Sequence, residues 1–256
     1  MIHTKDSLLK DLGHSGIDPN GTLLVHSSMK AIGKCEHGAD TVLDALIEYM
    51  QGGLLIFPTH TWKTVGAQET VYDPTSSSCC VGILPSLFLT RPDVIRSLHP
   101  THSVAAIGKD AKTYTNNEEK HNTPCPRNGC YGKLYDRRAQ ILFLGCDLSK
   151  NTFLHGVEEW NNVPDRMTDQ MQELYIQTKD GLLPCPQHRH YCSKCKNVSF
   201  HYGKMESAFI ATGVAKYCKI GDASCVLGDA VAMADITSRH LKINPDLFID
   251  AAPVSV

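Results

Sequence analysis

The chain has 256 residues and a formal net charge of −2, from 25 Lys and Arg against 27 Asp and Glu. Interspersed charges of both signs give no broad positive face, which argues against a nucleic-acid or membrane partner and favours a small molecule. No apolar run reaches the roughly 18 residues of a membrane span, and the N-terminus lacks a signal peptide's apolar core. We therefore expect a cytoplasmic protein with one domain over residues 1–256, and eleven cysteines that are mostly reduced.

The first sixty residues alternate between helical and strand patterns. Thr4 caps and Gly13 ends the first expected helix. Apolar runs over 22–28 and 54–59 predict buried strands, and amphipathic spacing over 38–50 predicts a helix between them. This order predicts an α/β fold of three layers, with a central mixed β-sheet flanked by helices.

The remaining chain continues the pattern less regularly. A helix is expected over 82–90, and short strands over 103–108 and 139–147. Residues 116–134 are rich in Asn, Pro and Gly and are expected to form a loop. After residue 160 the sequence predicts, in order, a strand of an antiparallel pair over 171–178, an irregular segment over 184–200, and a strand, a turn at Gly228-Asp229 and a helix over 223–241.

Two polar clusters accompany predicted strands. His26, Ser27 and Ser28 end the first strand and precede a loop with Gly33, so hydroxyls and free backbone N–H groups are available to an anionic or amide-bearing ligand. The alternative is an ordinary strand-to-helix turn. The second cluster gathers five polar residues within eight positions and must bind itself or a ligand to avoid unsatisfied groups. Its members are Arg96, Ser97, His99, His102 and Ser103.

A third motif, "NTFLHGVEEW", follows the most apolar strand. In a helix that begins near Asn151 or Thr152, His155 and Glu158 are three residues apart and face the same way. A carboxylate beside an imidazole fixes its tautomer and raises its basicity, as a general base requires. A solvated polar helix face is the alternative. The position after a strand's carboxyl end, where open α/β sheets bind ligands, favours the catalytic interpretation.

A fourth motif, "CPQHRHYCSKC", contains C-x-x-H followed by C-x-x-C. Each half is usable in a zinc site, although the gap between them is shorter than in most structural zinc loops. The alternatives are a pocket lining or a thiol-rich loop. The candidate ligands are Cys185, His188, His190, Cys192 and Cys195.

Together these stretches resemble the aminoglycoside 3-N-acetyltransferase family. The matching segments, in order, are "LLVHSSMKAIG", "GGLLIFPTHTW", "YDPTSSSCCVGILPSLF", "VIRSLHPTHSVAAIGKDA" and "ILFLGCDLSKNTFLHGVEE". They cover about residues 20–160, whereas residues 161–256 match less clearly.

The resemblance implies a mixed-sheet fold unlike that of GNAT acetyltransferases, in an antibiotic N-acetyltransferase. Antibiotic resistance as the biological role of this chain does not follow from it. The resemblance also implies direct acetyl transfer from acetyl-CoA to the 3-amino group of an aminoglycoside or a related amine, without an acyl-enzyme. His155 would be the general base and Glu158 its supporting carboxylate, while residues 161–256 would help to form the acceptor site. Contacts with CoA would come from His26, Ser27, Ser28, Ile32, Gly33, Arg96, Ser97, His99 and Ser103.

The sequence leaves several questions open. A polycationic acceptor needs an acidic pocket, to which Asp73, Asp147, Glu159, Asp165 and Asp169 are candidate contributors. The alternative functions are a zinc-dependent hydrolase or amidase and a CoA-binding protein without turnover. Neither the amine acceptor, the oxyanion donors nor the oligomeric state follows from the sequence.

Overall fold

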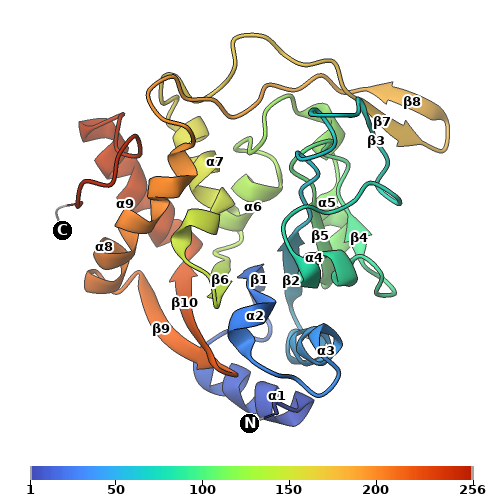
Figure 1. The fold of residues 1–256 in the computed structure, drawn as a ribbon, viewed down its shortest axis with the longest axis vertical. Coiled ribbons are helices and arrows are strands. Elements are labelled where there is room, and N and C mark those ends of the chain that lie inside the picture. The colour runs from blue at the N-terminus through green and yellow to red at the C-terminus, as the bar shows by residue number, and fades with distance from the viewer. Residues whose placement is uncertain (1, 255–256) are drawn as a thin grey trace.

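A seven-stranded mixed sheet forms the centre of the protein, with helices on both faces (Figure 1). The computed structural model describes residues 2–254. The strand order is β4-β5-β2-β1-β6-β10-β9; β1 pairs in parallel with β2 and β6, and the other pairs are antiparallel. The strands are β1 Thr22–Ser27, β2 Leu54–Pro58, β4 Ile95–Arg96, β5 Val104–Gly108, β6 Gln140–Leu144, β9 Ala215–Ile220 and β10 Ala223–Asp229.

Alternating side chains of the sheet build two hydrophobic cores. In β1, Leu23 and Val25 pack in the core that α1 and α3 cover, whereas Leu24 packs in the core that α7 and α9 cover. The α-helices are α1 Lys5–Ser15, α2 Met29–Ile32, α3 Ala39–Tyr49, α4 Ile83–Phe88, α5 Ala111–Thr115, α6 Cys130–Asp136, α7 Thr152–Trp160, α8 Glu206–Ala211 and α9 Ala230–Ile243. The 3₁₀ helices are η1 Glu118–Lys120, η2 Leu148–Lys150 and η3 Val198–Met205. The predicted three-layer α/β fold is confirmed.

A small second sheet has the strand order β3-β7-β8, and its hairpin projects at the edge of the molecule (Figure 1). Its strands are β3 Val71–Tyr72, β7 Tyr175–Thr178 and β8 Gly181–Pro184. The strand expected within 171–178 is therefore present, and its partner β8 is antiparallel.

Three local predictions need correction. Gly13 lies inside α1, which continues to Ser15 and ends at Gly16, whose φ of 84° suits glycine. Residues 116–134 are not all loop, because they include η1 and the beginning of α6. No separate turn occurs at Gly228-Asp229, since both residues belong to β10 and the Asp229 side chain caps α9.

The parallel strands β1, β2 and β6 bring three loops together. His26 and Ser27 end β1, His60 lies just after β2, and Cys146 lies just after β6. Because β1 lies between β2 and β6, their carboxyl ends meet at one edge of the sheet, where open α/β folds place ligands.

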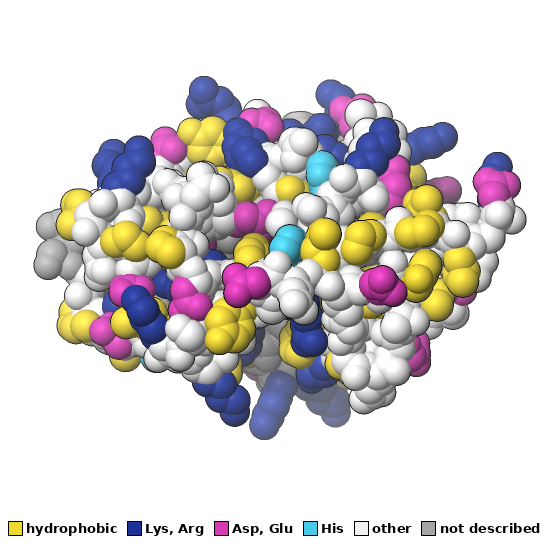
Figure 2. All heavy atoms as spheres, turned by 90° about the horizontal axis from the view of Figure 1, so that it is seen from above, with side chains coloured by type: hydrophobic (Ala, Val, Ile, Leu, Met, Phe, Trp, Pro, Cys, Tyr) yellow, Lys and Arg dark blue, Asp and Glu magenta, His cyan; other side chains and the backbone are white. Residues whose placement is uncertain are grey.

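The surface in Figure 2 carries charges of both signs, and the cysteines carry free thiols. On the face shown in Figure 2, basic and acidic side chains are interspersed and no extended patch of one sign forms. Within residues 2–254, no helix is long and apolar enough to cross a membrane. All eleven cysteines lie in this range and are free thiols.

Candidate active site

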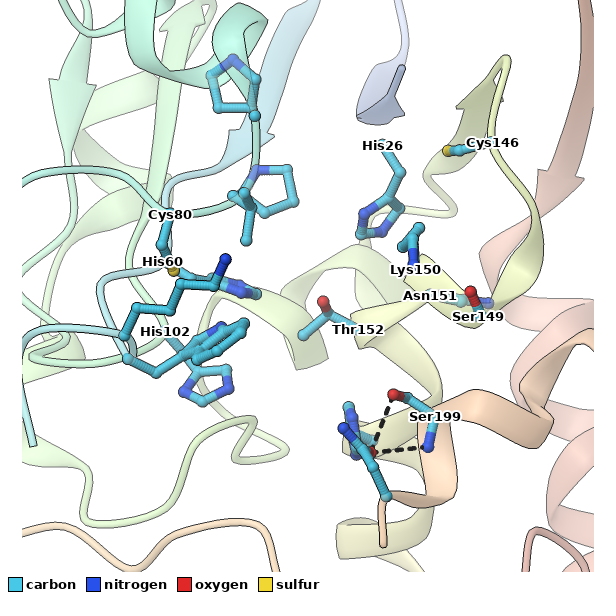
Figure 3. Close-up of a pocket in the computed structure, with 18 of the residues that line it drawn as sticks. His26, His60, Cys80, His102, Cys146, Ser149, Lys150, Asn151, Thr152 and Ser199 are labelled. Carbon is cyan, nitrogen blue, oxygen red and sulfur yellow. Dashed lines mark hydrogen bonds between the residues drawn. The ribbon is translucent and has the colours of Figure 1, made fainter. Parts of the chain in front are cut away.

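A cavity of about 900 Å³ opens at the carboxyl ends of the parallel strands. His60 and His102 lie on one side, and His26, Cys146 and Lys150 on the other (Figure 3). His26 and Ser27, at the end of β1, and Ser28, just after it, all line this cavity.

The other residues predicted to contact CoA lie outside the cavity lining. Ile32 is buried in the core beneath α2. Gly33 has a φ of 90°, and an added Cβ there would lie 2.2 Å from Asp222. These positions give both residues a structural role, since any side chain at 33 would be strained and crowded.

The Arg96 cluster supports the cavity wall from behind. The Arg96 guanidinium donates to the carbonyls of Thr59, at 2.8 Å, and Ser77, at 2.7 Å. Ser103 also donates to the carbonyl of Thr59, and the Ser97 hydroxyl accepts from the backbone N–H of Val104. The polar side chains of this cluster therefore find their hydrogen-bond partners within the protein. Through the carbonyl of Thr59 they also hold the segment that carries His60.

His99 belongs to the same supporting cluster. Its Nδ1 accepts from the backbone N–H groups of Thr101 and His102, and its Nε2 lies 3.0 Å from the carbonyl of Thr123. Nδ1 must therefore be unprotonated and Nε2 protonated. This neutral imidazole orders the turn that presents His102 to the cavity.

His155 lies on α7 and lines the cavity. Buried Phe153, Leu154 and Val157 anchor the helix in the core, so the turn that carries His155 points toward the loops. The His155 ring stacks on His190, with centroids 3.9 Å apart and planes at 13°. Its Nδ1 lies 2.7 Å from the Tyr202 hydroxyl.

Glu158 lies on the same side of α7 but does not hydrogen-bond to His155. Its nearest carboxylate oxygen is 4.0 Å from His155 Nδ1. The Tyr202 hydroxyl donates to that oxygen, and Arg166 Nε donates to the other at 2.6 Å. The expected pairing of base and carboxylate is therefore indirect, with Tyr202 between them.

Further histidines extend the site. His102 lies 5.0 Å from His190 and 4.7 Å from His60, measured between ring centroids. His60 Nε2 is 2.6 Å from the Tyr131 hydroxyl. Rings from four separate segments thus form a continuous wall that ends at His155.

Burial keeps these imidazoles neutral. It lowers the pKa of His155 well below the usual range, and the nearby His190 lowers it further. It also lowers the pKa values of His26 and His190 to about 3. Each of these imidazoles is therefore neutral at pH 7 and has one unprotonated nitrogen, while the lowered pKa makes it a weaker base than a free imidazole.

Burial has the opposite effect on the thiols and carboxyls. It raises the pKa of Cys146 to about 12, and it raises that of Cys80. Burial also raises the pKa of Glu158, which the hydrogen bonds from Tyr202 and Arg166 oppose. The thiols of Cys80 and Cys146, two of the three cysteines that line the cavity, are therefore protonated and weakly nucleophilic near pH 7.

The expected acidic pocket is largely absent. Of the five candidate acidic residues, Asp147 alone lines the cavity. Glu159 accepts from Thr123 and from the backbone of Cys125, and Asp165 accepts from Ser193. Asp73 accepts from its own turn, and Asp169 lies outside the lining. The cationic side chains in the lining are Lys30, Lys63, Lys150, Arg189 and Lys196.

The Cys/His motif does not assemble a metal site. His188 Nδ1 contacts the carbonyl of Thr168, and His190 stacks on His155. Cys185 is buried under the small sheet, whereas Cys192 accepts from Arg166. In the described part of the chain, no three His, Cys, Asp or Glu side chains are arranged to hold a metal ion.

Sequence reasoning did not identify His60, Tyr131, Arg166 or Tyr202 as part of the site. His60 had a usable signal, because it directly follows the predicted strand over 54–59. Arg166 and Tyr202 had none, since they lie in weakly patterned sequence and reach Glu158 only through the tertiary fold.

The fold and the candidate site are those of an α/β enzyme in which His155 lies in a cavity at the carboxyl ends of the parallel strands. The family model described as aminoglycoside 3-N-acetyltransferase matches residues 24–242. The chain therefore belongs to this family of acyltransferases.

Two known relatives match over nearly the whole chain. The chain is 26% identical to the prophage-derived aminoglycoside N(3')-acetyltransferase-like protein YokD of Bacillus subtilis, over 95% of this chain and 93% of YokD. It is 25% identical to aminoglycoside N(3)-acetyltransferase III of Salmonella sp, over 94% and 92% respectively.

Solved structures share the fold. AAC-IIIb in its binary complex with CoASH superposes with a TM-score of 0.83 and 23% identity, over 95% of this chain and 97% of that one. A histidine-to-alanine mutant of AAC(3)-IVa in complex with a gentamicin gives a TM-score of 0.84 and 23% identity, over 97% and 92%.

Proposed function

We propose that the protein transfers the acetyl group of acetyl-CoA directly to an amine, with His155 as the general base. Family membership supports aminoglycoside 3-N-acetyltransferase activity, so the first acceptor to consider is the 3-amino group of an aminoglycoside, and related amines come next. The observation that carries the proposal is a neutral histidine in a cavity, supported from behind through its Nδ1.

The cavity suits an anionic thioester. Five cationic side chains and one carboxylate line it, which favours the phosphate groups of CoA. The relative AAC-IIIb has a structure with CoASH. These residues fit acetyl-CoA as the donor, and they leave His26, Ser27 and Ser28 to contact its pantetheine arm.

The chemistry requires the removal of two protons from the ammonium form of the acceptor. An amine is mostly protonated at pH 7 and first loses one proton to solvent. The neutral amine then attacks the thioester carbonyl, and His155 takes a second proton from the attacking nitrogen. The C–N bond forms, the C–S bond breaks, and the proton passes from His155 to the leaving CoA thiolate. Because the pKa values of Cys80 and Cys146 are raised, direct attack is favoured over an acetyl-cysteine intermediate at either of these two residues.

Thiol release from acetyl-CoA, measured with a panel of aminoglycosides and simple amines, tests this function. We expect release that depends on the amine and is unaffected by EDTA. His155→Ala should lower kcat by about 10²–10⁴-fold, the range for a lost general base, and should leave CoA binding intact in calorimetry.

His37→Ala is the matched control, because His37 is exposed and lies outside the cavity lining. It should retain full activity. CoA binding without turnover on any amine would instead identify a binding protein, and EDTA-sensitive hydrolysis would identify a metal-dependent hydrolase.

A further inference from the structure

The carboxylate expected to support the base does not reach it, and a tyrosine hydroxyl fills the gap. Glu158 Oε2 and His155 Nδ1 are 4.0 Å apart, which is too long for a hydrogen bond. The hydroxyl of Tyr202, on η3, contacts both atoms and lies 2.7 Å from Nδ1. The hydrogen-bonded connection between Glu158 and His155 therefore runs through this hydroxyl.

The hydroxyl has only one hydrogen for its two neighbours. An ionised carboxylate only accepts hydrogen bonds, so beside ionised Glu158 the Tyr202 hydrogen must point to Oε2. The Tyr202 oxygen can then interact with His155 Nδ1 only as an acceptor, which requires a proton on Nδ1. A neutral imidazole with a proton on Nδ1 has its free lone pair on Nε2.

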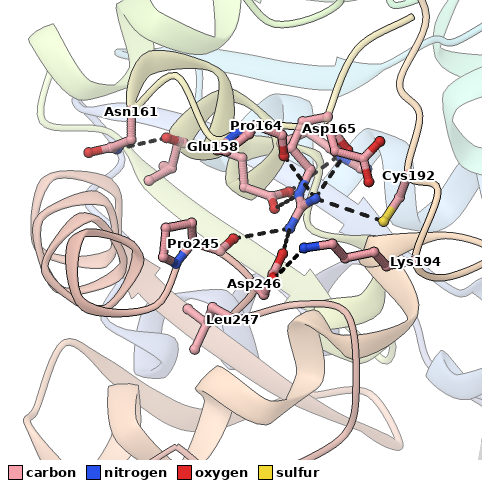
Figure 4. A network of polar contacts seen from close by, with 12 residues as sticks. Glu158, Asn161, Pro164, Asp165, Cys192, Lys194, Pro245, Asp246 and Leu247 are labelled. Carbon is pink, nitrogen blue, oxygen red and sulfur yellow. Dashed lines mark hydrogen bonds and ion pairs between the residues drawn. The ribbon is translucent and has the colours of Figure 1, made fainter.

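Arg166 keeps Glu158 ionised. Its guanidinium is always charged, is only 4% exposed, and donates to Glu158 Oε1 at 2.6 Å. The other groups around it are neutral carbonyls and a thiol (Figure 4), from Pro164, Asp165, Pro245 and Cys192. The next carboxylate, that of Asp246, is 3.9 Å away and 38% exposed. Protonation of Glu158 would leave a buried cation poorly compensated, which is strongly unfavourable.

The Tyr202 ring is held in a fixed position. It is fully buried and packs edge-on against Phe248, with centroids 4.7 Å apart, and against His155 itself, at 4.9 Å. The hydroxyl therefore stays between the two side chains without reorganisation when the base acts.

We infer that Tyr202 is a positioning residue that fixes His155 in the tautomer with Nδ1 protonated and Nε2 free to accept the proton of the acceptor amine. Nε2 has no hydrogen-bond partner among residues 2–254, and the side chain that carries it lines the cavity. The catalytic consequence rests on the proposed function, whereas the tautomer itself does not. When Nε2 takes a proton, the positive ring then donates from Nδ1 toward the Tyr202–Glu158–Arg166 chain.

Nitrogen-15 NMR of the wild-type protein with labelled histidine reads the tautomer directly. The resonances of His155 are identified by their loss in His155→Ala. We expect a pyrrole-type Nδ1 and a pyridine-type Nε2 at pH 7. A pyridine-type Nδ1 would overturn the inference, whether or not any amine is acetylated, so this outcome is distinct from failure of the proposed function.

Tyr202→Phe tests the consequence for activity. It should lower kcat about 10–100-fold with the KM for acetyl-CoA little changed, because one hydrogen bond to the developing imidazolium is lost. The control is Tyr114→Phe, which removes another buried hydroxyl, one that donates to the carbonyl of Cys130 away from the cavity. If Tyr202→Phe folds and keeps wild-type kcat, or if both variants lose activity equally, Tyr202 has only a structural role.

Discussion

The buried imidazole of His26, in the cavity wall, makes the stability of the folded protein depend on pH. Its side chain is only 6% exposed and stacks on Phe143, with centroids 5.3 Å apart and planes at 13°. Burial lowers its pKa in the folded protein to about 3, against an ordinary value of 6.5. Below pH 6.5 the unfolded chain therefore binds a proton at His26 that the folded protein does not bind. Stability is lost as the pH falls from about 6.5 toward 3.

The size of this effect follows from the two pKa values. Each pH unit within the window lowers the free energy of unfolding by about 1.4 kcal/mol for one such group. Between pH 7 and pH 5 the active part of the window is about 1.5 units, which gives about 2 kcal/mol from His26 alone. That is a substantial part of the roughly 5–15 kcal/mol that stabilises an ordinary protein.

Guanidinium unfolding of wild type and His26→Phe, at pH 7 and at pH 5, isolates this contribution. Phenylalanine keeps a planar ring on Phe143 but cannot be protonated. Glu159 acts in the opposite direction, because burial raises its pKa to about 7, but both proteins contain it and its effect cancels. Wild type should lose about 2 kcal/mol more than the variant on acidification. Equal losses, with unchanged m-values, would refute the assignment of a neutral, buried His26.

Two further predictions concern the base and its support. Burial lowers the pKa of His155 well below 6.5. Between pH 5.5 and 8, kcat/KM should therefore rise as the acceptor ammonium group loses its proton, and not as the histidine loses one. Acceptors whose amines differ in pKa should therefore shift the profile, whereas a common inflection for all of them would contradict the neutral-base interpretation. Arg166→Met should lower stability by about 3–5 kcal/mol in chemical unfolding, since it leaves the Glu158 carboxylate buried without its cation. An exposed counterpart, Lys5→Met, loses only a solvated pair with Glu48 and should leave stability nearly unchanged.

The alternating first half of the fold was predictable because each element carries its own periodicity. Residues 23–25 and 54–58 are continuous apolar runs, as expected for strands buried on both faces, and β1 and β2 contain them. By contrast, β9 was missed. Its pattern of buried ends and exposed middle, from Ala215 to Ile220, is that of an edge strand whose partner β10 lies beyond a turn. Pairing of this kind is decided by the tertiary fold more than by local sequence.

The candidate site was predictable to the extent that it follows strand ends. His26 lines the cavity because it lies at the carboxyl end of β1, and His155 because it lies on α7, the first α-helix after β6; the sequence alone already places both of them there. The Arg96 cluster carried the same polar signal but turned inward, because its hydrogen bonds are satisfied by the backbone of Thr59 and Ser77. A polar cluster before a buried strand thus indicates that its side chains have hydrogen-bond partners. It does not reveal whether those partners belong to the protein or to a ligand.

The contacts of His155 show why the spacing of two residues on one helix was not enough to predict how they interact. Three residues of separation put His155 and Glu158 on one side of α7, but the turn leaves their nearest polar atoms 4.0 Å apart. That gap is close to the width that one bridging hydroxyl fills, and Tyr202, 44 residues beyond Glu158, supplies it. The Arg166 guanidinium then balances the negative charge of the buried Glu158 carboxylate. A carboxylate held in this way by a buried arginine and a tyrosine can orient an imidazole without touching it. In the proposed mechanism the motif H-x-x-E therefore supplies the base, and the less patterned chain after residue 160 determines which of its nitrogens is free.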